Sequence, residues 1–112
     1  MITEVVSQDF DEEVLNSDIP VFACFTTSQC GSCFALCLVM EDLAKEYDRR
    51  MKFVRIDVEK EPELAAMYNI LPLPAMLIFR ESEPVMRALG FQYKGSLRDL
   101  LDNVLVGGEQ IT

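Results

Sequence analysis

Residues 20–33 read PVFACFTTSQCGSC, and this stretch decides the fold class. Its first part, residues 20–25, is an uninterrupted apolar run of the kind that forms a strand covered on both faces. Its last part, CGSC, opens a helical pattern that extends to residue 50. Apolar residues recur in that pattern at spacings of three and four and predict one buried stripe: Cys33, Leu36, Cys37, Met40, Leu43, Ala44 and Tyr47. A pair of cysteines therefore stands where a buried strand ends and a long helix begins.

Strand and helix patterns alternate along the rest of the chain. Strands are predicted over residues 2–6, 21–25, 52–58, 74–79 and 85–89. Helices are predicted over residues 7–15, 31–50 and 62–68 and after the Gly95-Ser96 pair, where Ser96 and Asp99 stand at capping-box spacing. The resulting order, βαβαβαββα, predicts an α/β fold in which helices flank both faces of a mixed central β-sheet. A length of 112 residues suits one domain, which we expect to span residues 1–112.

Composition and charge exclude several classes of function. Hydrophobic residues make up 50% and charged residues 26% of the chain, a balance typical of a globular protein. The net charge of -9 would repel phosphate backbones and anionic lipid surfaces, so we expect neither a nucleic-acid nor a membrane partner. The longest apolar stretches, residues 19–25 and 70–79, are shorter than the roughly 20 residues of a membrane helix. The first ten residues lack the features of an export signal, so we expect a cytoplasmic protein.

Four cysteines in a reducing cytosol indicate catalysis, metal binding or core packing rather than a structural disulfide framework. The spacing of Cys30 and Cys33 is weak evidence alone, but their position at a helix start strengthens it. Unpaired amides and the positive end of the helix dipole favour a thiolate there, so Cys30 is the predicted nucleophile. Cys33 lies three residues later, under the first turn, and is the predicted resolving thiol.

The chain resembles the thioredoxins over nearly its whole length. The matching features are residues 21–25, the CGSC at the exit of that strand, Arg55-Ile56-Asp57, residues 62–70, the Leu73-Pro74 pair and Gly90. The resemblance implies the thioredoxin fold and the reduction of protein disulfides by dithiol–disulfide exchange, without a bound cofactor. It also implies disulfide-containing protein substrates and a flavoprotein disulfide reductase as electron donor.

The resemblance further implies a substrate-binding rim beside the cysteine pair. In the family, the proline matched by Pro74 is cis and faces the two cysteines from a neighbouring loop. That shape leaves the backbone of Leu73 free to pair with an extended substrate strand. The residues of the implied rim are Gly31, Leu73, Pro74, Gly90 and Phe91.

The chain departs from the family pattern around the cysteines, and we expect these departures to adjust the redox properties of the two thiols. Gln29 and Ser32 replace the tryptophan and proline of W-C-G-P-C, Cys24 replaces a buried aspartate, and Arg55 replaces the accompanying lysine. Arg55 cannot accept a proton, but its permanent charge can stabilise a thiolate. Because the aspartate usually helps to deprotonate the resolving thiol, the proton of Cys33 must pass to water or to Asp57.

Two other classes of function stay open beside the oxidoreductase. A thioredoxin-fold binding or scaffold module with slow or no turnover would explain the loss of the tryptophan and the buried acid. A cysteine metal-binding protein is the second, although the spacing C-x5-C-x2-C-x3-C fits neither a zinc ribbon nor a ferredoxin, and we expect no metal. We interpret Cys24 and Cys37 as core packing, with an auxiliary redox role as the alternative. A monomer is expected.

Overall fold

Five strands form one mixed sheet in the order β1-β3-β2-β4-β5 in the computed structural model, which describes residues 2–108. The strands are β1 (Ile2–Glu4), β2 (Val21–Thr26), β3 (Lys52–Asp57), β4 (Ala75–Arg80) and β5 (Glu83–Leu89). Strands β1, β2 and β3 are parallel, whereas β4 runs antiparallel to both β2 and β5. Met1 and residues 109–112, which belong to the expected domain, lie outside the described residues.

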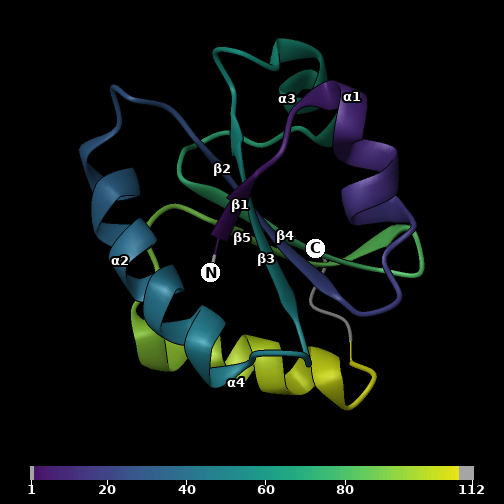
Figure 1. Ribbon diagram of the computed structural model, residues 1–112. Helices are drawn as coiled ribbons and strands as arrows, with labels where there is room; N and C mark the ends of the chain where they lie inside the picture. Colours follow the sequence, from purple (N-terminus) through teal and green to yellow (C-terminus); the bar gives the residue numbers. More distant parts are fainter. Residues whose placement is uncertain (1, 109–112) are drawn as a thin grey trace.

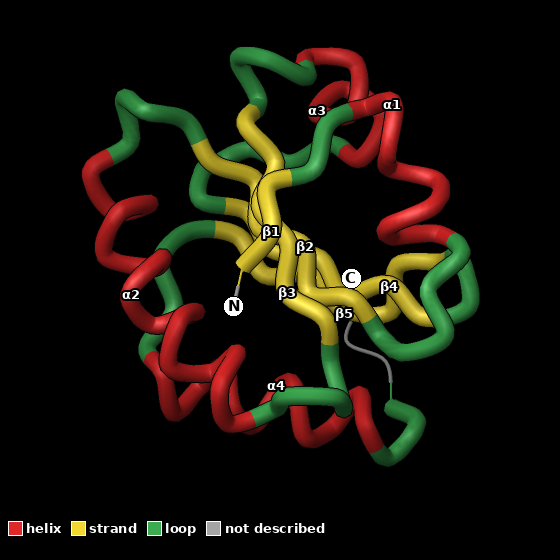
Figure 2. Tube along the Cα trace, viewed as in Figure 1, coloured by secondary structure: helices red, strands yellow, loops and turns green. Residues whose placement is uncertain are grey.

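The helices cover both faces of this sheet. They are α1 (Ser7–Phe10), which continues into the π-helical segment η1 (Asp11–Leu15), α2 (Gly31–Glu46), α3 (Pro62–Tyr68) and α4 (Lys94–Leu105). Figures 1 and 2 show α2 and α4 on one side of the sheet, and α1 and α3 on the other. The observed order of elements confirms the predicted βαβαβαββα arrangement. Within the described residues, no helix is long and apolar enough to cross a membrane.

Strand β2 lies at the centre of two apolar clusters, one on each face of the sheet. All six of its residues are buried, as the apolar sequence predicted for residues 21–25, and the strand extends one residue further, to Thr26. Because side chains alternate along a strand, Phe22 and Cys24 join the cluster under α2 and α4, whereas Val21, Ala23 and Phe25 join the cluster under α1 and α3. The strand therefore holds the loop that follows it, and the cysteines of that loop, against a rigid core.

Helix α2 ends at Glu46, so the prediction that it reaches residue 50 is wrong. Tyr47 leaves the helical conformation at φ -107° and ψ 19°. The amides of Arg50 and Met51 both donate to the Tyr47 carbonyl, and Arg49 takes a left-handed φ of 69°. A turn therefore replaces the last helical turn, and it directs the chain into β3.

Helix α4 begins at Lys94, two residues before the predicted cap at Ser96, so the predicted capping box is wrong. The N-cap residue is Tyr93, and its side chain makes no capping hydrogen bond. The amide of Leu97 donates to the Tyr93 carbonyl at 3.0 Å, which closes the first turn around Ser96 rather than after it. The predicted strand limits also shift slightly, because β1 ends at Glu4 and β5 begins at Glu83.

Polar contacts join α4 to neighbouring elements. The Tyr47 hydroxyl donates to the Asp102 carboxylate at 2.6 Å and so links the end of α2 to α4. On β4, the Arg80 guanidinium donates to the Val104 carbonyl at 2.9 Å and to the carbonyls of the two glycines that follow α4, each at 3.4 Å. A cation at the carboxyl end of a helix is favourable because it satisfies unpaired carbonyls and complements the helix dipole.

Candidate active site

Cys30 and Cys33 form a disulfide at the start of α2, with their Cα atoms 5.3 Å apart. Cys30 is the N-cap residue and has an extended conformation, with φ -106° and ψ 105°. The amide of Cys33 donates to the Cys30 carbonyl at 3.1 Å, which places Cys33 in the first turn. Cys30 is partly exposed, whereas Cys33 is only 3% exposed. The two sulfurs therefore differ in access to a reaction partner, as the sequence predicted.

The surroundings of Cys30 favour negative charge on its sulfur. The first turn of α2 contains no acidic residue, so no carboxylate competes for the unpaired amides and the positive end of the helix dipole. The Ser32 hydroxyl lies 3.6 Å from the Cys30 sulfur and can donate to it. Ser32 and Gln29 are both exposed at the mouth of the site.

The loop before β4 lies at the same end of the sheet as the cysteines. The antiparallel register pairs Phe25 with Ala75. Pro74 is the residue before Ala75 and therefore lies opposite the end of β2. The Leu73-Pro74 peptide bond is cis, as the resemblance implied, and the Leu71-Pro72 bond is cis as well. The amide of Gly90 donates to the Pro74 carbonyl at 2.8 Å. Gly90 has a φ of 82°, in the region that favours glycine, and this shape lets the loop after β5 close onto Pro74.

A cavity of about 270 Å³ lies beside the cysteine pair, on the side of α2 and β3. Ten residues line it: Glu4, Thr26, Thr27, Ser28, Cys30, Cys33, Phe34, Cys37, Arg55 and Asp57. The cavity brings together both predicted redox cysteines and the predicted tuning residue Arg55. It does not include Cys24, which is completely buried beneath it in β2.

The thioredoxin family model matches residues 1–103 of the chain. The chain belongs to the thioredoxin family. It is 34% identical to a thioredoxin of Staphylococcus epidermidis over 104 residues, which cover 93% of this chain and 98% of that protein. Thioredoxins of Staphylococcus haemolyticus and Staphylococcus aureus are each 33% identical over the same shares of the two chains.

Family membership and the disulfide at the start of α2 together establish the chemistry of this chain. It is a thiol–disulfide oxidoreductase of the thioredoxin family, with Cys30 and Cys33 as its redox-active pair. Its substrates are proteins that contain disulfides, as the family implies. The predicted fold class and reaction are therefore both confirmed.

Two of the predicted tuning residues, Arg55 and Cys24, lie with Glu4 in a row across three strands of the sheet. In the parallel register, Arg55 pairs with Glu4 on one side and with Cys24 on the other. The Arg55 guanidinium donates to the Glu4 carboxylate at 3.1 Å. This hydrogen bond lowers the pKa of Glu4 and raises the pKa of Arg55. The charge of Arg55 is therefore balanced by a carboxylate on the edge strand.

Burial raises the pKa of the Cys24 thiol well above its usual range, and the nearby Cys37 raises it further. The side chain is 0% exposed and belongs to the core cluster under α2 and α4. Cys24 therefore stays a neutral thiol and cannot replace a carboxylate as proton acceptor. Its packing against the core agrees with the interpretation made from the sequence.

Seven residues of the cavity lie outside the redox and tuning residues predicted from the sequence: Glu4, Thr26, Thr27, Ser28, Phe34, Cys37 and Asp57. The sequence raised Asp57 only as an alternative to water as proton acceptor, and Cys37 only as an alternative redox residue. Asp57 and Arg55 are two apart on one strand and so share a face, which was the available signal. Cys37 and Phe34 follow Cys33 within one helical turn, but the helical pattern predicted Cys37 as fully buried rather than partly exposed. Nothing in the sequence pairs Glu4 with Arg55, because that contact depends on which strand lies beside β3.

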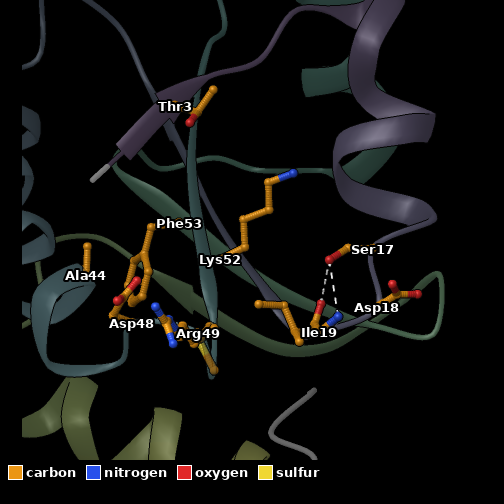
Figure 3. A pocket seen from close by; sticks show the side chains of 10 residues that line it. Thr3, Ser17, Asp18, Ile19, Ala44, Asp48, Arg49, Lys52 and Phe53 are labelled. Carbon is orange, nitrogen blue, oxygen red and sulfur yellow. Dashed lines mark hydrogen bonds between the residues drawn. The ribbon is translucent and has the colours of Figure 1, made fainter.

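A second cavity, of about 500 Å³, lies at the opposite end of β2 and β3 (Figure 3). Its lining residues include Asp18, Asp48, Arg49 and Lys52, but none of them is a cysteine. The redox chemistry therefore belongs to the smaller cavity. Within residues 2–108, no three or more His, Cys, Asp or Glu side chains are grouped so that they could hold a metal ion.

Proposed function

We propose that Cys30 is the nucleophile and Cys33 the resolving thiol in the reduction of protein disulfides. The Cys30 thiolate attacks a substrate disulfide, a mixed disulfide forms, and one substrate sulfur leaves as a thiolate. Cys33 then attacks the Cys30 sulfur, which releases the second substrate sulfur and closes the Cys30–Cys33 bond. The substrate gains two electrons and the protein loses two. The single observation that carries this assignment is the disulfide between a partly exposed N-cap cysteine and a buried cysteine in the first turn.

Substrates dock, in this proposal, on a rim formed by Gly31, Leu73, Pro74, Gly90 and Phe91. The hydrogen bond from Gly90 to Pro74 supports the proposal because it holds two parts of the rim together. Gly31 and Phe91 are exposed, and the Phe91 ring packs edge to face against Tyr93 at a centroid distance of 5.3 Å. An apolar rim beside a thiolate suits an extended peptide segment that carries a disulfide.

Four residues adjust the redox properties of the Cys30–Cys33 pair in this proposal: Gln29, Ser32, Cys24 and Arg55. Ser32 acts on the Cys30 sulfur directly, and its hydroxyl lies within reach of that sulfur. Arg55 acts through its charge at the wall of the cavity. Cys24 has its effect because it is a neutral thiol at a position where a carboxylate is usual in the family.

The wider role of the protein follows from the same chemistry. The oxidised pair must be reduced by an external donor, and a flavoprotein disulfide reductase is the donor that the family suggests. We place the protein in the cytoplasm, as one domain over residues 1–112 that acts as a monomer. The net charge of -9 supports the monomer because like-charged copies repel one another. Size-exclusion chromatography at low and high salt tests this point.

Reduction of insulin disulfides by the purified protein, with dithiothreitol as the electron donor, tests the proposed function. Cys30→Ser is expected to abolish turnover, and Cys33→Ser to accumulate a mixed disulfide that mass spectrometry detects. Cys37→Ser is the matched control, because it changes a thiol in the same cavity outside the disulfide and should retain turnover. If the wild-type protein is oxidised normally but turns over no faster than Cys30→Ser, the scaffold interpretation replaces this proposal.

A further inference from the structure

We propose that Asp57 accepts the proton that Cys33 loses when it resolves the mixed disulfide, and that solvent in the cavity beside the cysteine pair carries this proton. The inference rests on the proposed role of Cys33 as the resolving thiol. It assigns a proton acceptor to a chain that has no carboxylate at the position of Cys24 and contains no histidine.

A proton acceptor is needed because Cys33 is buried. A thiol that is only 3% exposed has little contact with bulk water, and the thiolate rather than the thiol is the nucleophile. Cys24 cannot take the proton, since burial keeps its own thiol neutral. Arg55 is permanently charged and cannot take it either. Among the side chains near Cys33, a carboxylate that lines the same cavity is therefore the group that can take the proton.

Asp57 meets this requirement by its position in the sheet. It pairs with Thr26 in the β2–β3 register, two residues beyond the Cys24–Arg55 pair in the direction of the cysteine loop. Because residues two apart on a strand share a face, Asp57 lies on the α2 side of the sheet together with Arg55. Asp57 and Cys33 both line the cavity of about 270 Å³. A space of this size with hydroxyl and charged side chains in its wall is large enough to hold water molecules.

The two carboxylates of the cavity differ in how their oxygens are engaged. The Glu4 oxygens both meet cations, since Oε1 accepts from Arg55 at 3.1 Å and Oε2 accepts from Lys60 at 3.4 Å. For Asp57, Oδ1 accepts from the amides of Glu59 at 2.8 Å and Lys60 at 3.3 Å, whereas Oδ2 has no hydrogen-bond partner among the described residues. The hydrogen bond from Arg55 also lowers the pKa of Glu4 and makes it the poorer acceptor. Asp57 is therefore the carboxylate with an oxygen free to receive a proton.

The charged and titratable groups around Asp57 come from several elements. Arg55 lies on its own strand, Glu4 on β1, and Cys30, Cys33 and Cys37 on α2 or its cap. Glu59, Lys60 and Glu61 follow β3, and the charge of Asp57 acts on Glu61. The two cations of this group, Arg55 and Lys60, both form ion pairs with Glu4.

The Cys33 S–H bond breaks, its proton passes through water to Asp57 Oδ2, and the Cys33 thiolate attacks the Cys30 sulfur. The bond between Cys30 and the substrate sulfur breaks, and that sulfur leaves as a thiolate. Asp57 then returns the proton to this thiolate or to solvent, and the cysteine pair is left oxidised.

The substitution Asp57→Asn tests the inference because asparagine keeps an Oδ1 acceptor for the amides of Glu59 and Lys60. The reduced protein is mixed in a stopped-flow instrument with the aromatic disulfide dithiobisnitrobenzoate. Attack by Cys30 releases the first coloured thiolate at a rate that depends on reagent concentration, and attack by Cys33 releases the second at a rate that does not. Asp57→Asn should leave the first rate unchanged and slow the second at pH 7 by about tenfold or more.

The pH profile and chemical rescue separate proton transfer from a structural effect. Loss of a negative neighbour alone would make Cys33 easier to ionise and would speed the second release at low pH, whereas loss of a proton acceptor slows it. Added formate should restore the second rate of Asp57→Asn, since a small carboxylate can enter the cavity. Asp48→Asn, at the opposite end of the sheet, changes the net charge equally and should alter neither rate.

Three results would overturn the inference: an unchanged second rate in Asp57→Asn, a slowed rate that formate does not restore, or the same slowing in Glu4→Gln but not in Asp57→Asn. Failure of the proposed function looks different. In that case Cys30→Ser would still give the first release, or Cys33→Ser would still give the second.

Discussion

Cys24 and Arg55 are direct partners in the parallel register of β2 and β3, with the thiol completely buried and the guanidinium turned to the Glu4 carboxylate. The sheet therefore holds a neutral thiol next to an ion pair at the position beneath the active site. The carboxylate of this region belongs to Glu4 on the edge strand β1, whereas the family usually has an aspartate at the position of Cys24 on the central strand β2. From this arrangement we expect the four thiols of the protein to differ in reactivity.

Cys24 is expected to resist alkylation in the folded protein. Burial raises its pKa and excludes reagents, so iodoacetamide should modify no more than the other three thiols of the reduced native protein. Mass spectrometry of peptides, before and after unfolding in guanidinium chloride, measures the labelled positions. Labelling of Cys24 at the rate of Cys37 without denaturant would contradict the prediction.

Ser32→Ala is expected to raise the pKa of the Cys30 thiol in the reduced protein. The Ser32 hydroxyl lies 3.6 Å from the Cys30 sulfur, and a donor at this place stabilises the thiolate relative to the thiol. The measurement is the pH dependence of Cys30 alkylation. The midpoint of wild-type protein should fall below the ordinary cysteine value of about 8.5, and that of Ser32→Ala should lie at higher pH.

Ser32→Thr is the control for this substitution because it keeps the hydroxyl. Its alkylation midpoint should stay close to that of the wild-type protein. Equal midpoints for Ser32→Ala and wild type would show that the amides of α2 alone stabilise the thiolate.

Tyr47 is expected to make the stability of the protein depend on pH in the alkaline range. Burial and the hydrogen bond to Asp102 raise the pKa of Tyr47 to about 12, from 10.0. Because the folded value is the higher one, this contribution to stability is complete below pH 10 and is lost as the pH rises through about 12. Urea unfolding at a series of pH values should show this loss in the wild type and less of it in Tyr47→Phe. A steeper loss in Tyr47→Phe would refute the assignment.

Arg80→Met is expected to lower the free energy of unfolding by about 1–2 kcal/mol. The substitution keeps much of the apolar side chain but removes the donors that satisfy the Val104 carbonyl and the two glycine carbonyls after α4. Urea denaturation measures the change. Arg80→Lys should lose less, because lysine keeps the charge near the helix end but cannot bridge several carbonyls. Disulfide reduction at low temperature should be unaffected in both variants, since Arg80 does not line the active-site cavity.

The position of the cysteine pair could be predicted from residues 20–33 because two strong signals meet there. A buried strand fixes the start of the loop, and the periodic apolar residues of α2 fix its end. The cis bond before Pro74 also followed, but only through the resemblance to the family. The cis bond before Pro72 was not anticipated, since nothing local in the sequence distinguishes it.

Helix limits and the walls of the cavity were harder to predict for different physical reasons. The end of α2 depends on the turn around the Tyr47 carbonyl, and the start of α4 depends on a backbone hydrogen bond to Tyr93 rather than on a capping side chain. The cavity brings Glu4 and Asp57 together with Cys33 through strand order and register. Those are properties of the assembled sheet, and the residue types of one strand do not specify them.

The two cavities lie at opposite ends of β2 and β3, and the distance between these ends has a practical use. Asp18 is exposed at the end that lacks cysteine, about the length of a strand from the disulfide. A linker attached there would immobilise the protein on an electrode or an affinity resin with its thiols directed outward. Such a support would capture disulfide-bearing clients from solution while leaving the reactive end unobstructed.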